Sequence, residues 1–164
     1  MTAPDSSAPP LVVRSAVEAD LEALVDMLAD DELGRTRELP ARPLARCYRD
    51  AFGEIQRDPN AELVVLERGG EVVGTLQLNF LRGIGLQGAR RAQIEAVRIR
   101  SSLRGRKLGE YLIRWAIERA REKGCHVVQL TSNLARKDAH RFYERLGFRT
   151  THTGMKLVLK TTPT

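Results

Sequence analysis

The sequence predicts one domain of the mixed α+β class, and three observations support this prediction. The chain has 164 residues, which is the size of a single domain. Hydrophobic residues make up 42% of it and charged residues 29%, as in ordinary globular proteins, so a wholly disordered chain is excluded. Apolar residues follow helical spacing in some segments and strand-like alternation in others.

The first half of the chain is expected to begin with a strand and two helices and to end in a β-hairpin. A lead-in over residues 1–10 is rich in Pro and Ser and is expected to be disordered. Apolar residues from Leu21 to Leu28 recur at helical spacing, and Gly69 and Gly70 between two apolar runs are typical of a hairpin turn. The expected elements are a strand at 11–13, helices at 18–33 and 44–56, and strands at 61–67 and 72–81.

The second half is expected to alternate strands and helices. Segment 89–100 has a helix-like composition, yet Glu95, Val97 and Ile99 alternate with their neighbours as in a strand, so both structures stay open here. Apolar side chains share one face of 108–123, which is the clearest helix. The other expected elements are strands at 125–131, 148–151 and 155–159 and a helix at 138–146. The expected organisation is a lead-in at 1–10, one domain at 11–160 and a tail at 161–164.

The two halves of the chain differ in charge. Residues 1–82 hold nine Arg and no Lys against fifteen acidic residues, a net charge of −6. Residues 83–164 hold thirteen Arg and five Lys against six acidic residues, a net charge of +12. The basic half is therefore expected to meet nucleic acid, a membrane surface or a phosphorylated cofactor, unless it is simply a solvated surface. The absence of a run of aromatic residues for base stacking argues against nucleic acid.

Several classes of protein are excluded by what the sequence lacks. No stretch approaches the roughly 18 apolar residues of a membrane span, and the first ten residues do not resemble a signal peptide. Two cysteines are too few for a disulfide framework. The spacing of His126, His140 and His152 is unlike that of metal ligands, so no metal is expected. The sequence predicts a soluble, cytoplasmic protein with no membrane partner.

Two glycine-containing segments are candidate phosphate-binding loops. Gly83 to Gly88 fits the pattern G-x-G-x-x-G, but position 108 lacks the acidic residue of a dinucleotide site, so a loop between antiparallel strands is favoured. Segment 101–109 leads into the strongest helix and carries Arg104, Arg106 and Lys107. Because basic residues oppose the macrodipole at a helix N-terminus, a bound phosphate would stabilise this arrangement. A basic, solvated turn is the alternative.

Two motifs in order resemble the GNAT superfamily of acetyl-CoA-dependent N-acetyltransferases. The first is Arg-Gly-x-x-Leu-Gly at 104–109, and the second is Ala-x-x-Phe-Tyr-Glu-x-Leu-Gly-Phe at 139–148. The opening from Val12 to Leu21 is also similar to that family. Lys107 departs from the motif, because it stands where the inner glycine is expected. The resemblance implies a mostly antiparallel central sheet flanked by helices, with acetyl-CoA as co-substrate.

The resemblance also implies roles for individual residues. Glu95 would accept the proton of the acceptor amine, with an exposed strand glutamate as the alternative, and Tyr143 would donate a proton or hydrogen bond to the CoA thiolate. Backbone groups of three strand residues would pair with the pantetheine arm, and the glycine loop would hold the pyrophosphate. The implied cofactor-binding residues are Val97, Arg98, Ile99, Arg104, Gly105, Arg106, Lys107, Leu108, Gly109, Asn133 and Tyr143.

The family places the acceptor pocket near segments 30–45 and 82–91 of this chain. The resemblance implies direct acetyl transfer to a primary amine, with a small molecule favoured over a protein lysine or N-terminus. Two alternatives stay open: a dinucleotide-dependent enzyme that uses the Gly83–Gly88 loop, and an acyl-CoA-binding domain without catalysis. A homodimer is compatible with the family, but no segment identifies an interface.

Overall fold

The computed structural model describes residues 9–30 and 34–159. The predicted tail at 161–164, and most of the predicted lead-in, lie outside these residues. The helices and strands, in chain order, are β1 (Leu11–Ser15), α1 (Leu21–Ala29), α2 (Arg46–Arg57), β2 (Ala61–Arg68), β3 (Glu71–Arg82), α3 (Gly85–Gly88), β4 (Arg90–Ile99), α4 (Leu108–Glu122), β5 (Cys125–Leu130) and α5 (Lys137–Arg145). Short 3₁₀ turns occur at Glu18–Asp20, Gly34–Thr36 and Ser101–Leu103.

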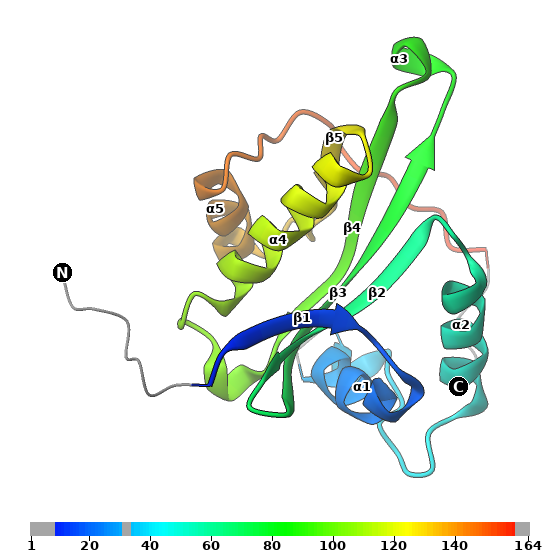
Figure 1. The fold of residues 1–164 in the computed structure, drawn as a ribbon, viewed down its shortest axis with the longest axis vertical. Helices are drawn as coiled ribbons and strands as arrows, with labels where there is room; N and C mark the ends of the chain where they lie inside the picture. Colours follow the sequence, from blue (N-terminus) through cyan, green and yellow to red (C-terminus); the bar gives the residue numbers. More distant parts are fainter. Residues whose placement is uncertain (1–8, 31–33, 160–164) are drawn as a thin grey trace, which may run out of the picture.

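The described strands form one five-stranded sheet in the order β1-β2-β3-β4-β5 (Figure 1). Neighbours from β1 to β4 are antiparallel, and only β4 and β5 are parallel. The prediction of an α+β domain with a mostly antiparallel sheet is therefore confirmed. Segment 89–100, for which both a helix and a strand were open, forms the strand β4. It is a strand because β3 and β5 pair with it on its two sides.

The sheet separates two apolar layers. Successive side chains of a strand point to opposite faces, so one set of β3 and β4 residues packs against α4, as Leu78 does with Leu112 in a fully buried cluster. The other face packs against α1 and α2, where Val25 and Phe52 share a buried cluster with Val65. Helix α2 contacts β2, and α1 contacts β3 and β4. Figure 1 shows α4 and α5 on one side of the sheet and α1 and α2 on the other. The β3–β4 arm extends beyond both of these helices, so they cover only one end of the second face (Figure 1).

The Gly83–Gly88 loop is the tip of an arm formed by β3 and β4. Figure 1 shows these two strands extending past their neighbours to the α3 turn. They are antiparallel, whereas a dinucleotide fold needs parallel strands joined by a helix. Leu86 and Gln87 have left-handed φ values of +53° and +58°, and Ile84 is 95% exposed. The favoured loop between antiparallel strands is confirmed, and the dinucleotide hypothesis is wrong.

The two strands expected at 148–151 and 155–159 are not formed. This segment is irregular backbone after α5, and its apolar residues Met155, Leu157, Val158 and Leu159 are 74–92% exposed. An alternating apolar pattern becomes a strand only where a neighbouring strand pairs with it and one face is buried. Within the described residues no strand pairs with this segment, and Phe148 is its only apolar residue that packs against the core.

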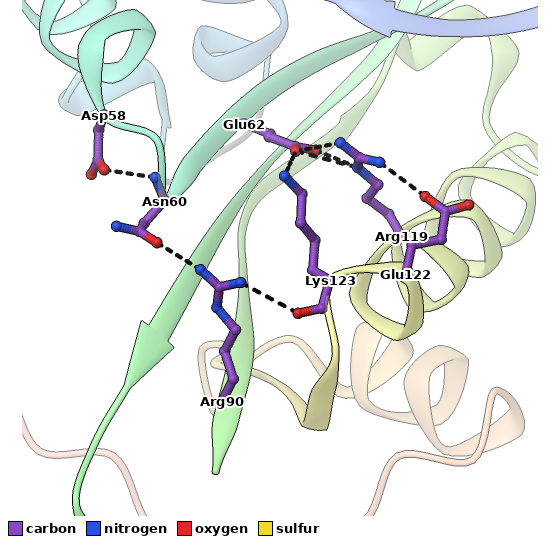
Figure 2. Close-up of polar contacts among 7 residues, drawn as sticks. All are labelled: Asp58, Asn60, Glu62, Arg90, Arg119, Glu122 and Lys123. Carbon is purple, nitrogen blue, oxygen red and sulfur yellow. Dashed lines mark hydrogen bonds and ion pairs between the residues drawn. The ribbon is translucent and has the colours of Figure 1, made fainter. Parts of the chain in front are cut away.

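A partly buried ion-pair network joins the start of β2 to the end of α4 (Figure 2). Arg119 donates to both carboxylate oxygens of Glu62, at 2.7 Å and 2.9 Å, and the Lys123 ammonium lies 3.1 Å from the same carboxylate. Arg119 also donates to Glu122 at 2.9 Å. Arg90, at the start of β4, donates to the Lys123 carbonyl at 3.3 Å. These contacts join the starts of β2 and β4 to the end of α4.

We expect Glu62→Gln to lower the free energy of unfolding by about 1–2 kcal/mol at pH 7, because a charge-assisted bidentate contact is lost. Arg119, aided by Lys123, lowers the pKa of Glu62 below its ordinary 4.5. The carboxylate's contribution is therefore present above that pH and is lost as the pH falls through the lower folded-state pKa. Urea unfolding of both proteins between pH 7 and pH 3 measures the difference.

The matched control is Glu122→Gln, whose ion pair with Arg119 is exposed at the surface. An exposed pair contributes at most about 1 kcal/mol, so the change should be smaller. Equal unfolding free energies for the wild type and Glu62→Gln at pH 7 would contradict a stabilising role for the network.

Candidate active site

The strands β4 and β5 separate before β4 ends. Their pairing stops at Ile94 and Leu130, whereas β4 continues to Ile99. The predicted pantetheine-binding residues Val97, Arg98 and Ile99 all lie in this continuation. Backbone N–H and C=O groups alternate along the edge of a strand. An extended ligand in the opening can therefore form the hydrogen bonds with β4 that an added strand would form.

A β-bulge lies in β4 at the beginning of this opening. Thr75 of β3 pairs with Arg98, but Gln77, two residues later, pairs with Glu95, three residues earlier on β4. The extra residue brings Glu95 and Arg98 to the same face of the sheet. Ala96 within the bulge has a left-handed φ of +52°. Strained non-glycine residues of this kind concentrate at functional sites.

The predicted phosphate loop is a tight turn that ends where α4 begins at Leu108. Gly105 has a φ of +78°, and Lys107 has a φ of +61° although it carries a side chain. The first N–H groups of α4 have no partner within the helix and are directed at the loop. The side chains of Arg106 and Lys107 are exposed beside them. Such a helix start attracts an anion, as the sequence predicts.

Arg104 connects the phosphate loop to the end of α1. Its guanidinium donates to the carbonyl of Ile99 at 3.3 Å and to the carbonyl of Asp30 at 3.0 Å. A hydrogen bond from Ser101, together with the charge of Arg104, lowers the pKa of Asp30. Two predicted regions, the phosphate loop and the acceptor segment that starts at residue 30, are therefore in contact. A role for Arg104 at the pyrophosphate stays a prediction.

The conformation of Lys107 leads to a testable difference between two substitutions. Lys107→Gly and Lys107→Ala both remove the ammonium, but only glycine adopts a positive φ without strain. We expect the glycine variant to be about 0.5–1 kcal/mol more stable than the alanine variant. Both should bind acetyl-CoA about 10-fold more weakly than the wild type. Urea unfolding and titration calorimetry measure the two effects, and unchanged affinity in both variants would remove Lys107 from the phosphate site.

Tyr143 lies half-buried on α5, with its ring edge-on to two other aromatic rings. The ring centroids of Phe142 and Phe148 are 5.1 Å and 5.8 Å from its own. Burial raises the pKa of Tyr143 above its ordinary 10, and the positive charges of Arg136 and Arg98 act in the opposite direction. The phenol is therefore protonated at neutral pH and can donate a proton or a hydrogen bond.

Gly109 brings three of the predicted segments together. A Cβ atom at Gly109 would lie 3.5 Å from the Phe142 ring and 3.8 Å from Ile99. The first turn of α4, the end of β4 and the helix that carries Tyr143 therefore meet at one point. Asn133 is used locally, because its side-chain oxygen accepts a hydrogen bond from the Ala135 N–H at 2.9 Å. A contact between Asn133 and the cofactor stays a prediction.

Glu95 lies exposed on the sheet face that α1 and α2 cover only at one end. Four carboxamide side chains share this face, and sequence reasoning did not single them out. Asn79, Gln93 and Gln129 form a row across β3, β4 and β5, and Gln77 pairs with Glu95 beside that row. The alternation of polar with apolar residues along β3 was the signal that could have found them.

Other features of the molecule do not form a candidate active site. A cavity of about 320 Å³ lies between β1, β2 and α4, but its charged residues include Arg14, Glu62 and Arg119, which are already ion-paired. Within residues 9–30 and 34–159, no three His, Cys, Asp or Glu side chains are grouped to hold a metal ion. None of the described helices has the length and apolar character that crossing a membrane requires.

Comparison with known proteins places this geometry in a family. The family model described as "Acetyltransferase (GNAT) family" matches residues 21–148. An aminoalkylphosphonate N-acetyltransferase from Salmonella typhimurium is 36% identical over 110 residues, which cover 65% of this chain and 69% of that protein. An L-methionine sulfoximine/L-methionine sulfone acetyltransferase from Pseudomonas aeruginosa is 29% identical over 138 residues, covering 83% of this chain and 78% of the other.

A solved structure is also similar over nearly the whole chain. The crystal structure of a transcriptional regulator from Bacillus halodurans C-125 is 50% identical with a TM-score of 0.89, and it covers 92% of this chain and 100% of its own. The family match includes the β4–β5 opening, the phosphate loop and the helix of Tyr143. The family that the two motifs predicted is confirmed: the chain belongs to the acetyltransferase (GNAT) family and is an acetyl-CoA-dependent N-acetyltransferase.

Proposed function

We propose that the protein transfers the acetyl group of acetyl-CoA directly to the primary amine of a small molecule. The observation that carries this proposal is the opening between β4 and β5. It starts beside Glu95 and, at Ile99, it reaches the first turn of α4 and the helix that carries Tyr143. A thioester in this opening is reached by an amine from the open sheet face. No covalent intermediate on the protein is needed.

The two side chains supply the proton transfers of the reaction. A protonated amine cannot attack, so Glu95 takes its proton, directly or through a water molecule. The amine nitrogen then bonds to the acetyl carbonyl carbon, and the carbon–sulfur bond breaks with its electron pair on sulfur. Tyr143 donates the proton that converts the thiolate to the thiol. As the amide forms, its nitrogen loses its second proton to solvent. Solvent also removes the proton from Glu95 and restores the one on Tyr143, so that one proton is released for each ammonium group that is acetylated.

The cofactor would be held by backbone groups on one side and by the basic loop on the other. Val97 to Ile99 would pair with the pantetheine arm as an added strand, and the loop from Arg104 to Gly109 would bind the pyrophosphate at the start of α4. Asn133 would contact the cofactor from the loop before α5. The end of β4 and the first turn of α4 are adjacent at Ile99 and Gly109, so the two parts of this binding site are continuous.

The relatives support a small-molecule acceptor. The printed names of two of them describe acetylation of an aminoalkylphosphonate and of methionine derivatives. Each of these acceptors is a small primary amine that also carries an acidic group.

A thiol-release assay with acetyl-CoA and a panel of small primary amines tests the proposal. We expect release that depends on the amine, and we expect acetyl-CoA to raise the melting temperature by mass action, while NAD(H) leaves it unchanged. A raised melting temperature without thiol release from any amine would favour an acyl-CoA-binding domain without catalysis. Acetylation of peptide lysines or N-termini, with no activity on small amines, would refute the assigned acceptor class.

A further inference from the structure

The open face of β3, β4 and β5 carries a row of carboxamides whose register is set by the sheet. Asn79 is opposite Gln93, and Gln93 is opposite Gln129. Residues that are directly opposite in neighbouring strands point to the same face. The side-chain amide of Gln129 donates to Oε1 of Gln93 at 2.6 Å, and that of Gln77 donates to Oδ1 of Asn79 at 3.0 Å. The row is therefore an ordered surface rather than a set of independent side chains.

This surface retains hydrogen-bonding capacity that a ligand could use. Each carboxamide has two N–H donors and an oxygen with two lone pairs, and each of the two bonds uses one donor and one acceptor. All four side chains are half-buried, so solvent reaches them from one direction only. Half-buried polar groups on the part of a sheet face that the helices leave open favour a polar ligand over a packed protein element.

Opposite charges stand at the two ends of the row. Glu95 follows Gln93 by two residues and Arg91 precedes it by two, so all three side chains share the face. At about 3.3 Å per residue, the Cα atoms of Glu95 and Arg91 are about 13 Å apart. The Arg91 guanidinium lies beside Gly83 at the tip of the arm, where its Nη1 is 3.8 Å from the position of a Cβ atom. When this side chain turns back along the face toward Glu95, the distance between the charges becomes one that a small molecule spans.

Arg91 is available for a ligand, unlike the arginines beside it. Arg90 donates to Asn60 and Lys123, and Arg82 donates to Gly88. Among the described residues, no hydrogen bond or ion pair engages the guanidinium of Arg91, and its side chain is exposed. The residues on either side of it in the ladder are apolar and partly exposed, namely Leu81 at 37% and Val127 at 41%.

We infer that the acceptor is a zwitterion, with a primary amine held near Glu95, an acidic group bound by Arg91, and the carboxamide row as the floor between them. A guanidinium binds a carboxylate or a phosphonate through paired N–H groups. Leu81 and Val127 exclude water from one side of that contact. The inference rests on the proposed function and specifies the substrate class of the same site. Arg91 and Gln93 are then specificity-determining residues rather than catalytic ones.

The test compares 2-aminoethylphosphonate, β-alanine and the neutral propylamine as acceptors in the thiol-release assay. We expect the wild type to have a higher kcat/KM for the two acids than for propylamine. Arg91→Gln should lower the ratio of acid to neutral kcat/KM by about 10- to 100-fold, and Arg91→Lys should restore part of it. Arg82→Gln removes the same charge from the opposite face of the arm, and should keep the wild-type ratio.

Equilibrium binding of 2-aminoethylphosphonate to the CoA-saturated protein gives a readout that does not depend on turnover. Weaker binding by Arg91→Gln, but not by Arg82→Gln, supports the inference. Equal kcat/KM values for acids and propylamine in the wild type would overturn it, while leaving the proposed acetyltransferase function standing. Equal losses of acceptor binding in Arg91→Gln and Arg82→Gln would also overturn the inference, because binding of the acid would then depend only on the overall charge of the protein. Failure of the proposed function gives a different result, because the wild-type protein would then acetylate none of the amines.

Discussion

Glu95→Gln is expected to lower kcat/KM for the acceptor by about 10²–10⁴-fold, the usual contribution of a positioned general base. The substitution keeps the size and polarity of the side chain but removes its ability to accept a proton. Glu95 lies next to the bulge, on the open face of the sheet, and is not part of the predicted cofactor loop. The dissociation constant of acetyl-CoA should therefore stay close to that of the wild type.

The pH dependence identifies the step that is lost. A lysine-like amine has a free pKa of about 10.4, so the protein must remove a proton from it at neutral pH but not at high pH. The defect of Glu95→Gln should shrink steadily between pH 7 and pH 10. Glu118→Gln, at an exposed position on α4, is the matched control and should follow the wild-type profile. Wild-type turnover by Glu95→Gln at every pH would remove the base assignment, with the acetyltransferase family unaffected.

The sequence predicts the local structure of segments that depend on few distant contacts. The loop from Arg104 to Gly109 combines glycine and basic residues with a helix boundary, whereas the role predicted for Tyr143 comes only from the resemblance to the family. Glycine and basic residues before a helix predict an anion site through helix geometry alone. The same holds for the Gly69-Gly70 hairpin, where the turn determines the pairing of β2 and β3.

Features that depend on pairing between distant segments could not be predicted from the sequence. The carboxamide row exists only because Asn79, Gln93 and Gln129 are opposite one another in three strands. The bulge at Ala96 changes which residues share a face with Glu95, and nothing in the local sequence marks it. The prediction of a strand at 155–159 was wrong for the opposite reason. The segment has the residue pattern of a strand but no paired neighbour in the described part of the chain.

Lys107 departs from a local rule at a position where we propose that the cofactor binds. The sequence pattern predicts glycine in a turn with a positive φ, and the structure has that φ with a lysine in its place. A lysine there adds an ammonium beside the free N–H groups of α4, at the expense of backbone strain. Retaining a strained residue makes physical sense where its side chain contributes to binding.

Tyr143→Phe is expected to lower kcat by about 10²-fold at pH 7, with little change in acetyl-CoA affinity. Phenylalanine keeps the edge-on contacts with Phe142 and Phe148, which lie 5.1 Å and 5.8 Å away, so the packing of α5 is preserved. Only the hydroxyl is lost. The effect lies at the low end of the range for general acids, because a thiolate leaves more readily than an alkoxide.

The pH profile of Tyr143→Phe separates proton donation from a structural role. A simple thiol has a pKa near 8.5, so above that pH the thiolate departs without needing a proton. Burial raises the pKa of Tyr143 above 10, so the wild-type phenol still carries its proton throughout this range. The ratio of wild-type to variant kcat should therefore fall as the pH rises from 7 to 9.5. A ratio that stays constant with pH would assign Tyr143 a positioning role through its ring and hydroxyl. A variant with wild-type kcat at pH 7 would exclude the phenol from the transfer of the proton to sulfur.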